Sequence, residues 1–482
     1  MAENSKLRPS LERFSDILSE KDIEQILAIQ EQPLPIGIRI NPLKSNPAEA
    51  IAALSVRYGW QVTPIPFCEN GWLIHSSEKS PGTAIEHKMG QYYLQDAASM
   101  VPVSLFDMDL PQPLVLDMAA SPGGKTTHLI DRTGDKGFIL ANDGSKGRIS
   151  ALRAVLSNWG GANIAISNYP GESFGSWFPE TFDRVLLDAP CSMENLRPTE
   201  NRPLRETTMD ERLRLHDRQL DLLISGLTSL KIGGQMVYAT CSLAPEEDEM
   251  VVNAVLDQFP NTLQIEDVSQ RFQLHTPGIT SFGSEHFHPS LEHALRLWPH
   301  LTGMSGFFTV LITKTDTMPT NKQAPPARDL SRTGLLPLNT TETQALEDEI
   351  TKSFGLSLSA VLDDFNLQLF QRSQQYFLIP SAYLDRFQEL PYEYIGMSLG
   401  KWVSDRFEPS AEFISRFGWH FTKEIITISP EKVEQWIAGR DIRNPQVEKP
   451  AQGQYVLVKD SDGRNLGLGK LLPKRLRNML PR

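Results

Sequence analysis

The chain has 482 residues, of which 40% are hydrophobic and 22% charged, and its formal net charge is −12 at pH 7. This composition excludes a wholly disordered, collagenous or coiled-coil protein, and the length predicts about three domains. The acidic balance argues against a surface that attracts nucleic acid everywhere, but it leaves room for a local basic groove.

Targeting segments and disulfides are not expected. Residues 1–18 mix acidic and basic side chains, and no apolar run approaches the ~20 residues of a membrane span. The three cysteines, Cys68, Cys191 and Cys241, are too few for a disulfide framework or a multi-cysteine zinc site. We therefore expect a cytoplasmic protein that binds no metal and no membrane, in which each thiol serves packing or chemistry.

The predicted elements change character along the chain. Residues 10–28 have helical spacing, residues 37–41 form a strand, and a helix begins at residues 51–54. From residue 114 strands and helices alternate. The predicted strands are 114–118, 137–141, 164–166, 184–187, 235–241 and 306–314. The predicted helices are one through Thr126, one after the N-cap Ser145 that stops at Gly160, one at 209–230 closed by Gly233-Gly234, and one at 245–259.

This alternation predicts an α/β domain with an open, mainly parallel sheet that is covered on both faces. The loops that follow its strands then meet at one edge, which is where such sheets bind ligands. We place an N-terminal domain at 1–110, this domain at 111–315, a proline-rich linker at 316–329, an intermediate domain at 330–428 and a terminal domain at 429–482. The tail carries Lys470, Lys474, Arg475, Arg477 and Arg482 without an acid, which favours RNA only weakly.

A glycine-rich segment follows the first of these strands. It reads Ala119-Ala120-Ser121-Pro122-Gly123-Gly124-Lys125-Thr126. Paired glycines let a ligand approach the N–H groups of a helix N-terminus, although a tight turn would also need them. Gly124-Lys125-Thr126 fits a phosphate-binding P-loop, but Ala119 replaces the first glycine of that motif. Asp143, about 20 residues further, instead favours a cofactor that contains adenosine, whose ribose hydroxyls the carboxylate would bind.

Two thiols follow the ends of consecutive predicted strands. Cys191 lies in Asp188-Ala-Pro-Cys191, and Cys241 lies in Thr240-Cys241-Ser242. A single cysteine is most often a small buried apolar side chain, and we interpret Cys68 as packing or surface. If the two strands are neighbours, however, both sulfurs lie at the ligand-binding edge with Asp188 beside them.

Thiols beside such a cofactor suit methyl transfer to carbon 5 of cytosine. A thiolate that adds to C6 makes C5 electron-rich enough to attack an electrophilic methyl sulfonium. A base then removes the C5 proton and the thiol leaves by elimination. We expect Asp188 to bind the N3/N4 edge of the base, and a helix N-terminus near Pro245 to favour the thiolate. The target base must leave its stack to reach the pocket.

Four motifs carry a family resemblance: Leu-Asp117-Met-Ala-Ala-Ser-Pro-Gly-Gly-Lys125-Thr, Ala-Asn-Asp143, Leu-Asp188-Ala-Pro-Cys191-Ser and Thr-Cys241-Ser-Leu-Ala-Pro-Glu-Glu. Together they resemble the NOL1/NOP2/Sun family of S-adenosylmethionine-dependent RNA cytosine-C5 methyltransferases. The two thiol motifs in this order are a specific signature, whereas the glycine loop alone is not. Segments such as Arg296-Leu-Trp-Pro-His300 extend the resemblance over nearly the whole chain, least clearly at 315–430. The last residues are similar to a bacterial subgroup that methylates small-subunit ribosomal RNA.

The resemblance implies a Rossmann-like, seven-strand methyltransferase core, a small N-terminal α/β domain and a PUA-like RNA-binding region at the C-terminus. It makes Cys241 the nucleophile and Cys191 the residue that assists product release, with RNA, ribosomal RNA or the small ribosomal subunit as partner. The residues that it assigns to S-adenosylmethionine are Ala119, Ala120, Ser121, Pro122, Gly123, Gly124, Lys125, Asp143 and Asp188, the last in contact with cofactor or base.

The chain departs from the family pattern at two places. Met193 and Asn195 replace the glycines of a Cys-Ser-Gly-x-Gly motif, and Tyr169-Pro170-Gly171 stands where an Asp-Gly pair meets the adenine, with Glu172 as a possible substitute. Two alternatives stay open. One is a P-loop-like NTPase, which leaves the thiols unexplained. The other is an RNA-binding or assembly factor with weak activity on a methyltransferase scaffold.

Overall fold

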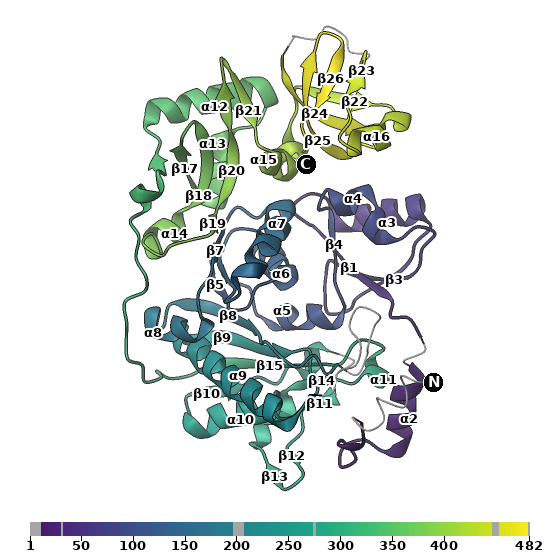
Figure 1. Cartoon of the computed structure of the whole chain (residues 1–482), viewed down its shortest axis with the longest axis vertical. Coiled ribbons are helices and arrows are strands. Elements are labelled where there is room, and N and C mark those ends of the chain that lie inside the picture. Colours follow the sequence, from purple (N-terminus) through teal and green to yellow (C-terminus); the bar gives the residue numbers. More distant parts are fainter. Residues whose placement is uncertain (1–10, 30–31, 196–206, 273–275, 446–452, 481–482) are drawn as a thin grey trace.

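The structure is a computed structural model that describes residues 11–29, 32–195, 207–272, 276–445 and 453–480. Ser10 of the first predicted helix and Arg482 of the basic tail lie outside these residues. In the part of the chain that is described, none of the helices combines the length and the apolar character that a membrane crossing needs. Figure 1 shows a central sheet, with the N-terminal region and the last sheet on neighbouring sides of it.

The N-terminal region has its own four-stranded sheet, in the order β2-β3-β1-β4. Its elements are α2 (Glu20–Ile29), β1 (Ile36–Ile40), α3 (Pro47–Tyr58), β2 (Gln61–Pro64), β3 (Gly71–Ser76), α4 (Ile85–Lys88) and β4 (Tyr92–Leu94), followed by α5 (Val101–Leu105). The start of α3 is set locally, because the Asn46 side chain accepts hydrogen bonds from the first two free N–H groups that follow Pro47. The first predicted helix is interrupted, and α2 begins only at Glu20.

The middle of the central sheet runs β7-β6-β5-β8-β9-β15, in which the first five strands are parallel and β15 is antiparallel. The sheet continues beyond β15 through β14 and β11, with β10 also paired to β15. The bounds are β5 (Leu114–Asp117), α6 (Gly124–Thr133), β6 (Phe138–Asn142), α7 (Ile149–Trp159), β7 (Ile164–Ser167), α8 (Phe174–Trp177), β8 (Phe182–Asp188), α9 (Met209–Ser229), β9 (Leu230–Thr240), α10 (Glu249–Gln258), β10 (Leu263–Ile265), β11 (Thr276–Pro277), β12 (Ser281–Phe282), β13 (Glu285–His286), β14 (Leu295–Leu297), α11 (Pro299–Thr302) and β15 (Phe307–Lys314). The mainly parallel α/β sheet predicted from the alternation is confirmed.

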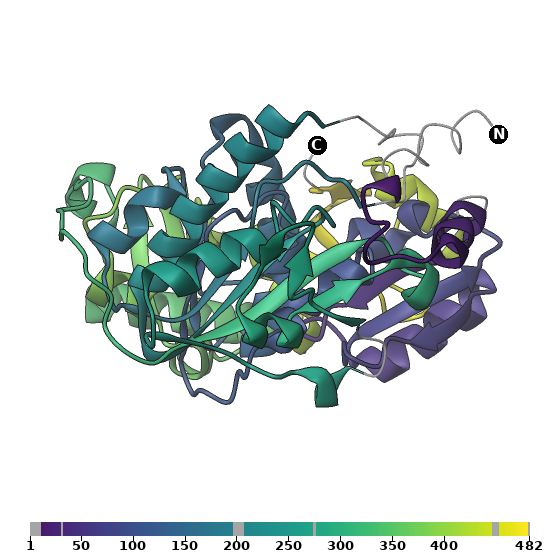
Figure 2. The ribbon, with the colours of Figure 1, turned by 90° about the horizontal axis from the view of Figure 1, so that it is seen from below.

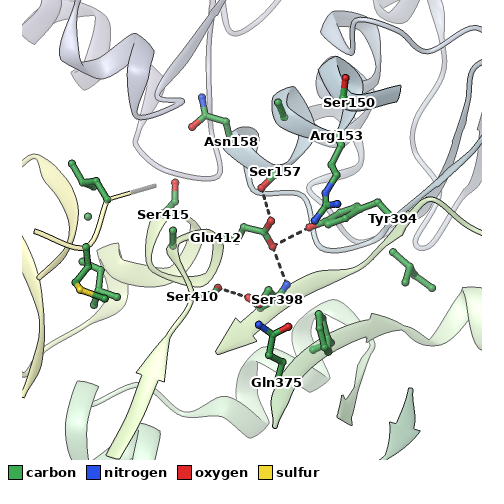
Figure 3. A pocket seen from close by; sticks show the side chains of 18 of the residues that line it. Ser150, Arg153, Ser157, Asn158, Gln375, Tyr394, Ser398, Ser410, Glu412 and Ser415 are labelled. Carbon is green, nitrogen blue, oxygen red and sulfur yellow. Dashed lines mark hydrogen bonds between the residues drawn. The ribbon is translucent and has the colours of Figure 1, made fainter. Parts of the chain in front are cut away.

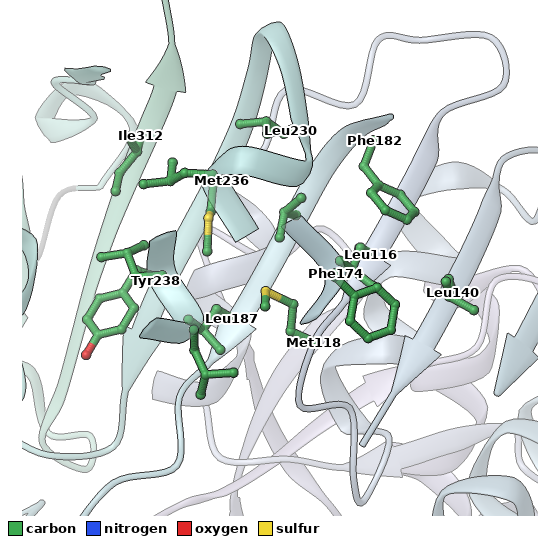
Figure 4. Packing of buried hydrophobic residues seen from close by; sticks show 14 of the residues in the cluster. Leu116, Met118, Leu140, Phe174, Phe182, Leu187, Leu230, Met236, Tyr238 and Ile312 are labelled. Carbon is green, nitrogen blue, oxygen red and sulfur yellow. The ribbon is translucent and has the colours of Figure 1, made fainter. Parts of the chain in front are cut away.

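Both faces of the sheet are buried, and alternate residues of each strand serve opposite faces. Leu187 and Tyr238 belong to the cluster that contains side chains of α8, α9 and α10 (Figure 4), whereas Leu186 and Val237 belong to the cluster that contains α5, α6 and α7. At roughly 25 cal/mol for each Å² of apolar surface, these two clusters are the main source of stability. They hold the ends of β8 and β9 rigidly side by side.

Three local predictions fail at the edges of elements. Helix α9 passes directly into β9 at Leu230, so Gly233-Gly234 lie within that strand. Helix α10 begins at Glu249, four residues after Pro245. The Ser145 side chain makes no capping hydrogen bond, and the Asp143 carboxylate accepts from the Ser145 N–H instead. The apolar face and the glycine stop of α7 are confirmed.

The linker at 316–329 contains no helix or strand, and two five-stranded sheets follow it. The first sheet has the order β16-β17-β18-β20-β21 and the second β22-β24-β25-β26-β23. Their elements are β16 (Leu336–Pro337), α12 (Thr340–Phe354), α13 (Leu358–Phe365), β17 (Leu367–Arg372), β18 (Gln375–Pro380), α14 (Ser381–Arg386), β19 (Tyr394–Ile395), β20 (Met397–Val403), β21 (Arg406–Pro409), α15 (Ala411–Phe417), β22 (Ile425–Ile428), α16 (Pro430–Ile437), β23 (Ile442–Arg443), β24 (Tyr455–Asp460), β25 (Asn465–Leu472) and β26 (Arg475–Asn478).

Two of these strands tie the regions together. β19 pairs with β7 and so becomes an edge strand of the central sheet. β22 lies before residue 429 yet pairs in parallel with β24, so the last sheet begins at Ile425. Residues 330–428 therefore supply one strand to the central sheet and one strand to the last sheet. The PUA-like character of the C-terminal region stays a prediction.

Candidate active site

The glycine loop lies between β5 and α6, at the carboxyl edge of the sheet. Gly123 has φ +115°, a conformation that L side chains rarely adopt, and a Cβ there would lie 2.9 Å from Val155. The Ser121 N–H donates to Asp143 Oδ2 at 3.1 Å, and the Ser145 N–H donates to Oδ1 at 2.9 Å. The buried Asp143 carboxylate thus links the loop to the end of β6, which brings all the residues predicted at 119–125 and Asp143 to one place.

Asp117 adds a carboxyl group beneath this loop. Its Oδ2 accepts from the Thr126 hydroxyl at 2.7 Å, but its Oδ1 is buried without a hydrogen-bond partner among the described residues. Burial, the largest cause, and the nearby carboxylates of Asp188 and Asp143 together raise the pKa of Asp117 to about 7, against the hydrogen bond from Thr126 and the charge of Lys125. A buried oxygen without a partner is costly, so this atom points to a ligand donor that would satisfy it.

Lys125 and Asp188 form an ion pair across the strand ends. The Lys125 ammonium donates to Asp188 Oδ2 at 2.7 Å and lies 5.3 Å from the centre of the Phe307 ring. Burial opposes the charge on Lys125, but the Asp188 carboxylate outweighs it, with smaller contributions from Cys241 and Asp117, so the pKa of Lys125 is raised. The resemblance assigned Lys125 to the cofactor loop, and in the structure its ammonium binds Asp188 at the end of β8.

The two thiols of the predicted pair meet. β8 and β9 are parallel neighbours, with Asp188 opposite Ala239, and the Sγ atoms of Cys191 and Cys241 are 3.2 Å apart. Both cysteines are only partly buried. Cys68 is elsewhere, buried with its Sγ 3.7 Å from His128 Nε2, as expected for a packing residue. Two sulfurs at one point of the ligand edge are able to act on the same atom of a substrate.

The groups around Cys191 disfavour its thiolate form. The hydrogen bond to Cys241 raises the pKa of Cys191, as do burial, the charge on Cys241 and the carboxylates of Glu247 and Asp188. Cys191 therefore keeps its proton at neutral pH, and the two thiols share one hydrogen bond.

Glu247 is a positioning residue that the sequence analysis missed. It is fully buried, and its two oxygens accept from the Ser192 N–H (2.8 Å), the Ser192 hydroxyl, the Ser242 hydroxyl (2.9 Å) and the Gln219 side-chain amide (3.1 Å). Ser192 follows Cys191 and Ser242 follows Cys241, so one carboxyl group joins both cysteine loops. In the sequence, Glu247 lies at the start of the helix predicted at 245–259, where acids are common. Its bonds to the two cysteine loops were therefore not expected.

The structure shows the local backbone at both departures from the family pattern. Met193 has φ +64°, so its backbone keeps the left-handed conformation that glycine favours, at a cost of about 1–2 kcal/mol for a non-glycine residue. After β7, the Asn142 side chain bonds both the N–H and the carbonyl of Tyr169 and so holds the Tyr169-Pro170 turn. Glu172 lies 3.4 Å from the Arg218 Nε.

Comparison with known families gives matches over most of the chain. Residues 109–313 match the family model of 16S rRNA methyltransferase RsmB/F. Residues 9–97 match the model of the N-terminal domain of 16S rRNA methyltransferase RsmF. The central sheet with the cysteine pair falls within the first match, and the four-stranded N-terminal sheet falls within the second.

Relatives and solved structures agree with these matches. Ribosomal RNA small subunit methyltransferase F of Klebsiella pneumoniae is 32% identical over 95% of this chain and 92% of its own length. The protein of that name in Vibrio campbellii is 30% identical over 98% and 96%. A methyltransferase homologue from Pyrococcus horikoshii has a TM-score of 0.55 and 31% identity over 63% of this chain and 93% of its own. NSun6 from the same organism, solved with SFG, shares the fold (TM-score 0.52, 19% identity, 63% and 97% covered).

Proposed function

The chain belongs to the 16S rRNA methyltransferase RsmB/F family, and from this premise we propose that it methylates carbon 5 of a cytosine in small-subunit ribosomal RNA, in the cytoplasm, with Cys241 as nucleophile. The members of this family are S-adenosylmethionine-dependent methyltransferases, and so is this chain. The roles of individual residues are our proposal. The observation that carries them is the 3.2 Å separation of the Cys191 and Cys241 sulfurs beside the Lys125–Asp188 ion pair.

The residues at the loop fit S-adenosylmethionine. Residues 119–125 offer backbone N–H groups at the start of α6, the Asp143 carboxylate lies at the end of β6, and the unpartnered Asp117 Oδ1 would accept from the amino group of the cofactor. When bound, the cofactor supplies an electrophilic methyl group on a sulfonium. Asp188, whose side chain is 33% exposed, lies between this loop and the thiols and contacts cofactor or base.

The thiols act in turn. The Cys241 thiolate bonds to C6 of the extruded cytosine, and the electron pair that this releases makes C5 the nucleophile toward the methyl group. Once Cys241 has bonded to carbon, Cys191 no longer shares a thiol hydrogen bond with that sulfur. Cys191 can then lose its proton to solvent and take the proton from C5. The C5–H electron pair reforms the C5=C6 double bond, and Cys241 leaves as a thiolate.

The other hypotheses explain less. A P-loop NTPase would direct Lys125 to phosphate, but here the ammonium is held by Asp188, and the NTPase leaves the paired sulfurs without a role. A weakly active scaffold protein would rest on the departures at Met193, Asn195 and Pro170. Met193 nevertheless keeps a glycine-like backbone, and the sulfurs still meet.

The function is tested by sequencing bisulfite-treated ribosomal RNA from cells with and without the gene. We expect one cytosine of the small subunit to lose protection in the deletion strain and to regain it when the purified protein and S-adenosylmethionine are added. A thermal-shift series accompanies it, because a ligand at 100 times its Kd stabilises the native state by about 2.7 kcal/mol. Stabilisation by ATP with magnesium and not by S-adenosylmethionine would support the NTPase. An unchanged cytosine pattern would refute the proposed function.

Substitutions of Glu247 separate positioning from charge. In Glu247→Gln the amide oxygen can still accept from the Ser192 N–H and Gln219, and its NH₂ can donate to the two serine hydroxyls, which rotate. We expect activity within about tenfold of wild type. Glu247→Leu leaves buried donors unpaired at roughly 1–3 kcal/mol each and frees both cysteine loops, so kcat should fall about 100-fold.

The measurement for Glu247 is single-turnover methylation alongside thermal unfolding and cofactor affinity. We expect cofactor affinity to change little in both variants, because Glu247 does not touch the glycine loop. Equal loss of activity in the Gln and Leu variants, with folding intact, would show that the charge and not the positioning matters.

A further inference from the structure

A large cleft lies away from the cysteines, at the junction of the central sheet and the two C-terminal sheets. Its volume is about 910 Å³, and it is lined by the exposed side of α7, by α15, and by residues of β18, β19, β20 and β25 (Figure 3). β19 is separated from β8 by three strands, so four strand spacings, or roughly 19 Å, separate the cleft's edge of the sheet from the strand that precedes Cys191. The cleft is thus distinct from the strand ends that carry the paired cysteines.

Two arginines in this cleft lie on aromatic rings. The Arg153 guanidinium is 5.0 Å from the centre of the Tyr394 ring, and that of Arg372 is 5.2 Å from the Phe377 ring. Figure 3 shows Arg153 beside Tyr394 at the wall of the cleft. Both arginines are exposed, and neither forms an ion pair with a carboxylate of the described residues. Cation–π attraction holds each guanidinium near its ring, and an exposed guanidinium is able to stack on another flat group.

The acids of the cleft offset this charge only in part. Glu412 is engaged, because it accepts from the Ser157 hydroxyl (2.6 Å), the Tyr394 hydroxyl (3.0 Å) and the Ser398 N–H (2.9 Å). These bonds fasten α15 to α7 and to β20, which keeps the walls of the cleft fixed. The second acid, Glu393, is exposed. Lys88 adds a third cation to the lining.

Positive charge continues past the end of the cleft. A neighbouring hollow shares Met479 and Leu480 with it and carries Arg475 and Arg477 of β26. Arg475 is paired with Asp441 at 3.3 Å. In a chain of net charge −12, such a run of cations beside flat, stackable groups matches single-stranded RNA, whose bases stack on arginine and aromatic planes while its phosphates meet cations.

We propose that this cleft binds a single-stranded segment of the substrate RNA that flanks the target cytosine, with bases stacked on Arg153 and Arg372. The proposal rests on the proposed function, since it takes ribosomal RNA as the ligand. It assigns the cleft to substrate affinity and not to the methyl-transfer step. Removing the arginines should therefore raise KM for RNA and leave kcat unchanged.

The test compares Arg153→Ala/Arg372→Ala with Lys136→Ala/Arg386→Ala. The control pair removes the same charge from exposed residues outside the cleft. The probes are unmethylated small ribosomal subunits from the deletion strain and a naked transcript of their RNA. For the cleft variant we expect KM to rise at least tenfold for both probes, kcat to stay within twofold, and the Kd of S-adenosylmethionine to be unchanged.

Three outcomes would overturn the proposal. Equal effects of the two variant pairs would show a non-specific charge effect. A loss confined to whole subunits, with naked RNA unaffected, would mean that a ribosomal protein occupies the cleft. A fall in kcat with KM unchanged would place the arginines in the chemical step. Failure of the proposed function is recognised separately, because the wild-type protein would then methylate neither probe.

Discussion

Cys241→Ala is expected to abolish methylation while the protein stays folded. The Cys241 sulfur supplies the bond to C6 without which C5 of cytosine is a poor nucleophile, so the rate should fall by roughly 10⁴-fold or more. The side chain is only partly buried at the ligand edge, and its loss should change the free energy of unfolding by about 1 kcal/mol or less. Transfer of a labelled methyl group to unmethylated small subunits measures the methylation rate. Thermal unfolding measures the change in stability.

The third thiol provides the matched control for this variant. Cys68 is buried beside His128 and does not lie at the strand ends that carry the paired sulfurs, so Cys68→Ala should keep full activity even if it unfolds a little earlier. S-adenosylmethionine should still raise the melting temperature of Cys241→Ala, because the cofactor loop is intact. Residual activity within tenfold of wild type would exclude Cys241 as the nucleophile.

Cys191→Ala is expected to accumulate a covalent protein–RNA complex through Cys241. The variant can still form the Sγ–C6 bond and accept the methyl group, but it lacks the group that removes the C5 proton, so elimination stalls. Removing the Cys191 thiol also removes the hydrogen bond that it shares with the Cys241 sulfur at 3.2 Å. A denaturing gel with labelled RNA should show a shifted band that depends on S-adenosylmethionine and disappears on nuclease treatment.

The double variant Cys191→Ala/Cys241→Ala defines the origin of that band. It should give no adduct, because the atom that bonds to C6 is absent. A shifted band in the double variant would identify a different nucleophile. No band in Cys191→Ala, under conditions where wild type methylates, would remove the release role from Cys191 and leave the proton at C5 to another base.

The sequence by itself determined what depends on neighbouring residues. Strand and helix periods predicted the parallel sheet, because a strand buried on both faces needs an unbroken apolar run and a helix needs one apolar stripe. The glycine pair predicted the turn into α6, where Gly123 has positive φ. Both cysteines could be placed at strand ends for the same reason, and the one assumption, that β8 and β9 are neighbours, holds.

Only the tertiary structure decided which distant groups become partners. Residues 245–248 read as the start of a helix, since proline and acids favour the first turn, yet the chain turns there and α10 begins at Glu249. The Glu247 carboxyl is drawn to serines of two loops, and Asp248 bonds to Thr240 at 2.6 Å and pairs with Arg296 at 3.3 Å. A buried carboxylate must be hydrogen-bonded by donors that lie near it in the folded protein. The free energy of these hydrogen bonds outweighs the preference of acids for the first turn of a helix, which is worth about 1 kcal/mol. The pairing of Lys125 with Asp188 and the cleft formed when β19 joins β7 have the same origin, because each depends on residues far apart in the chain that come into contact only after folding.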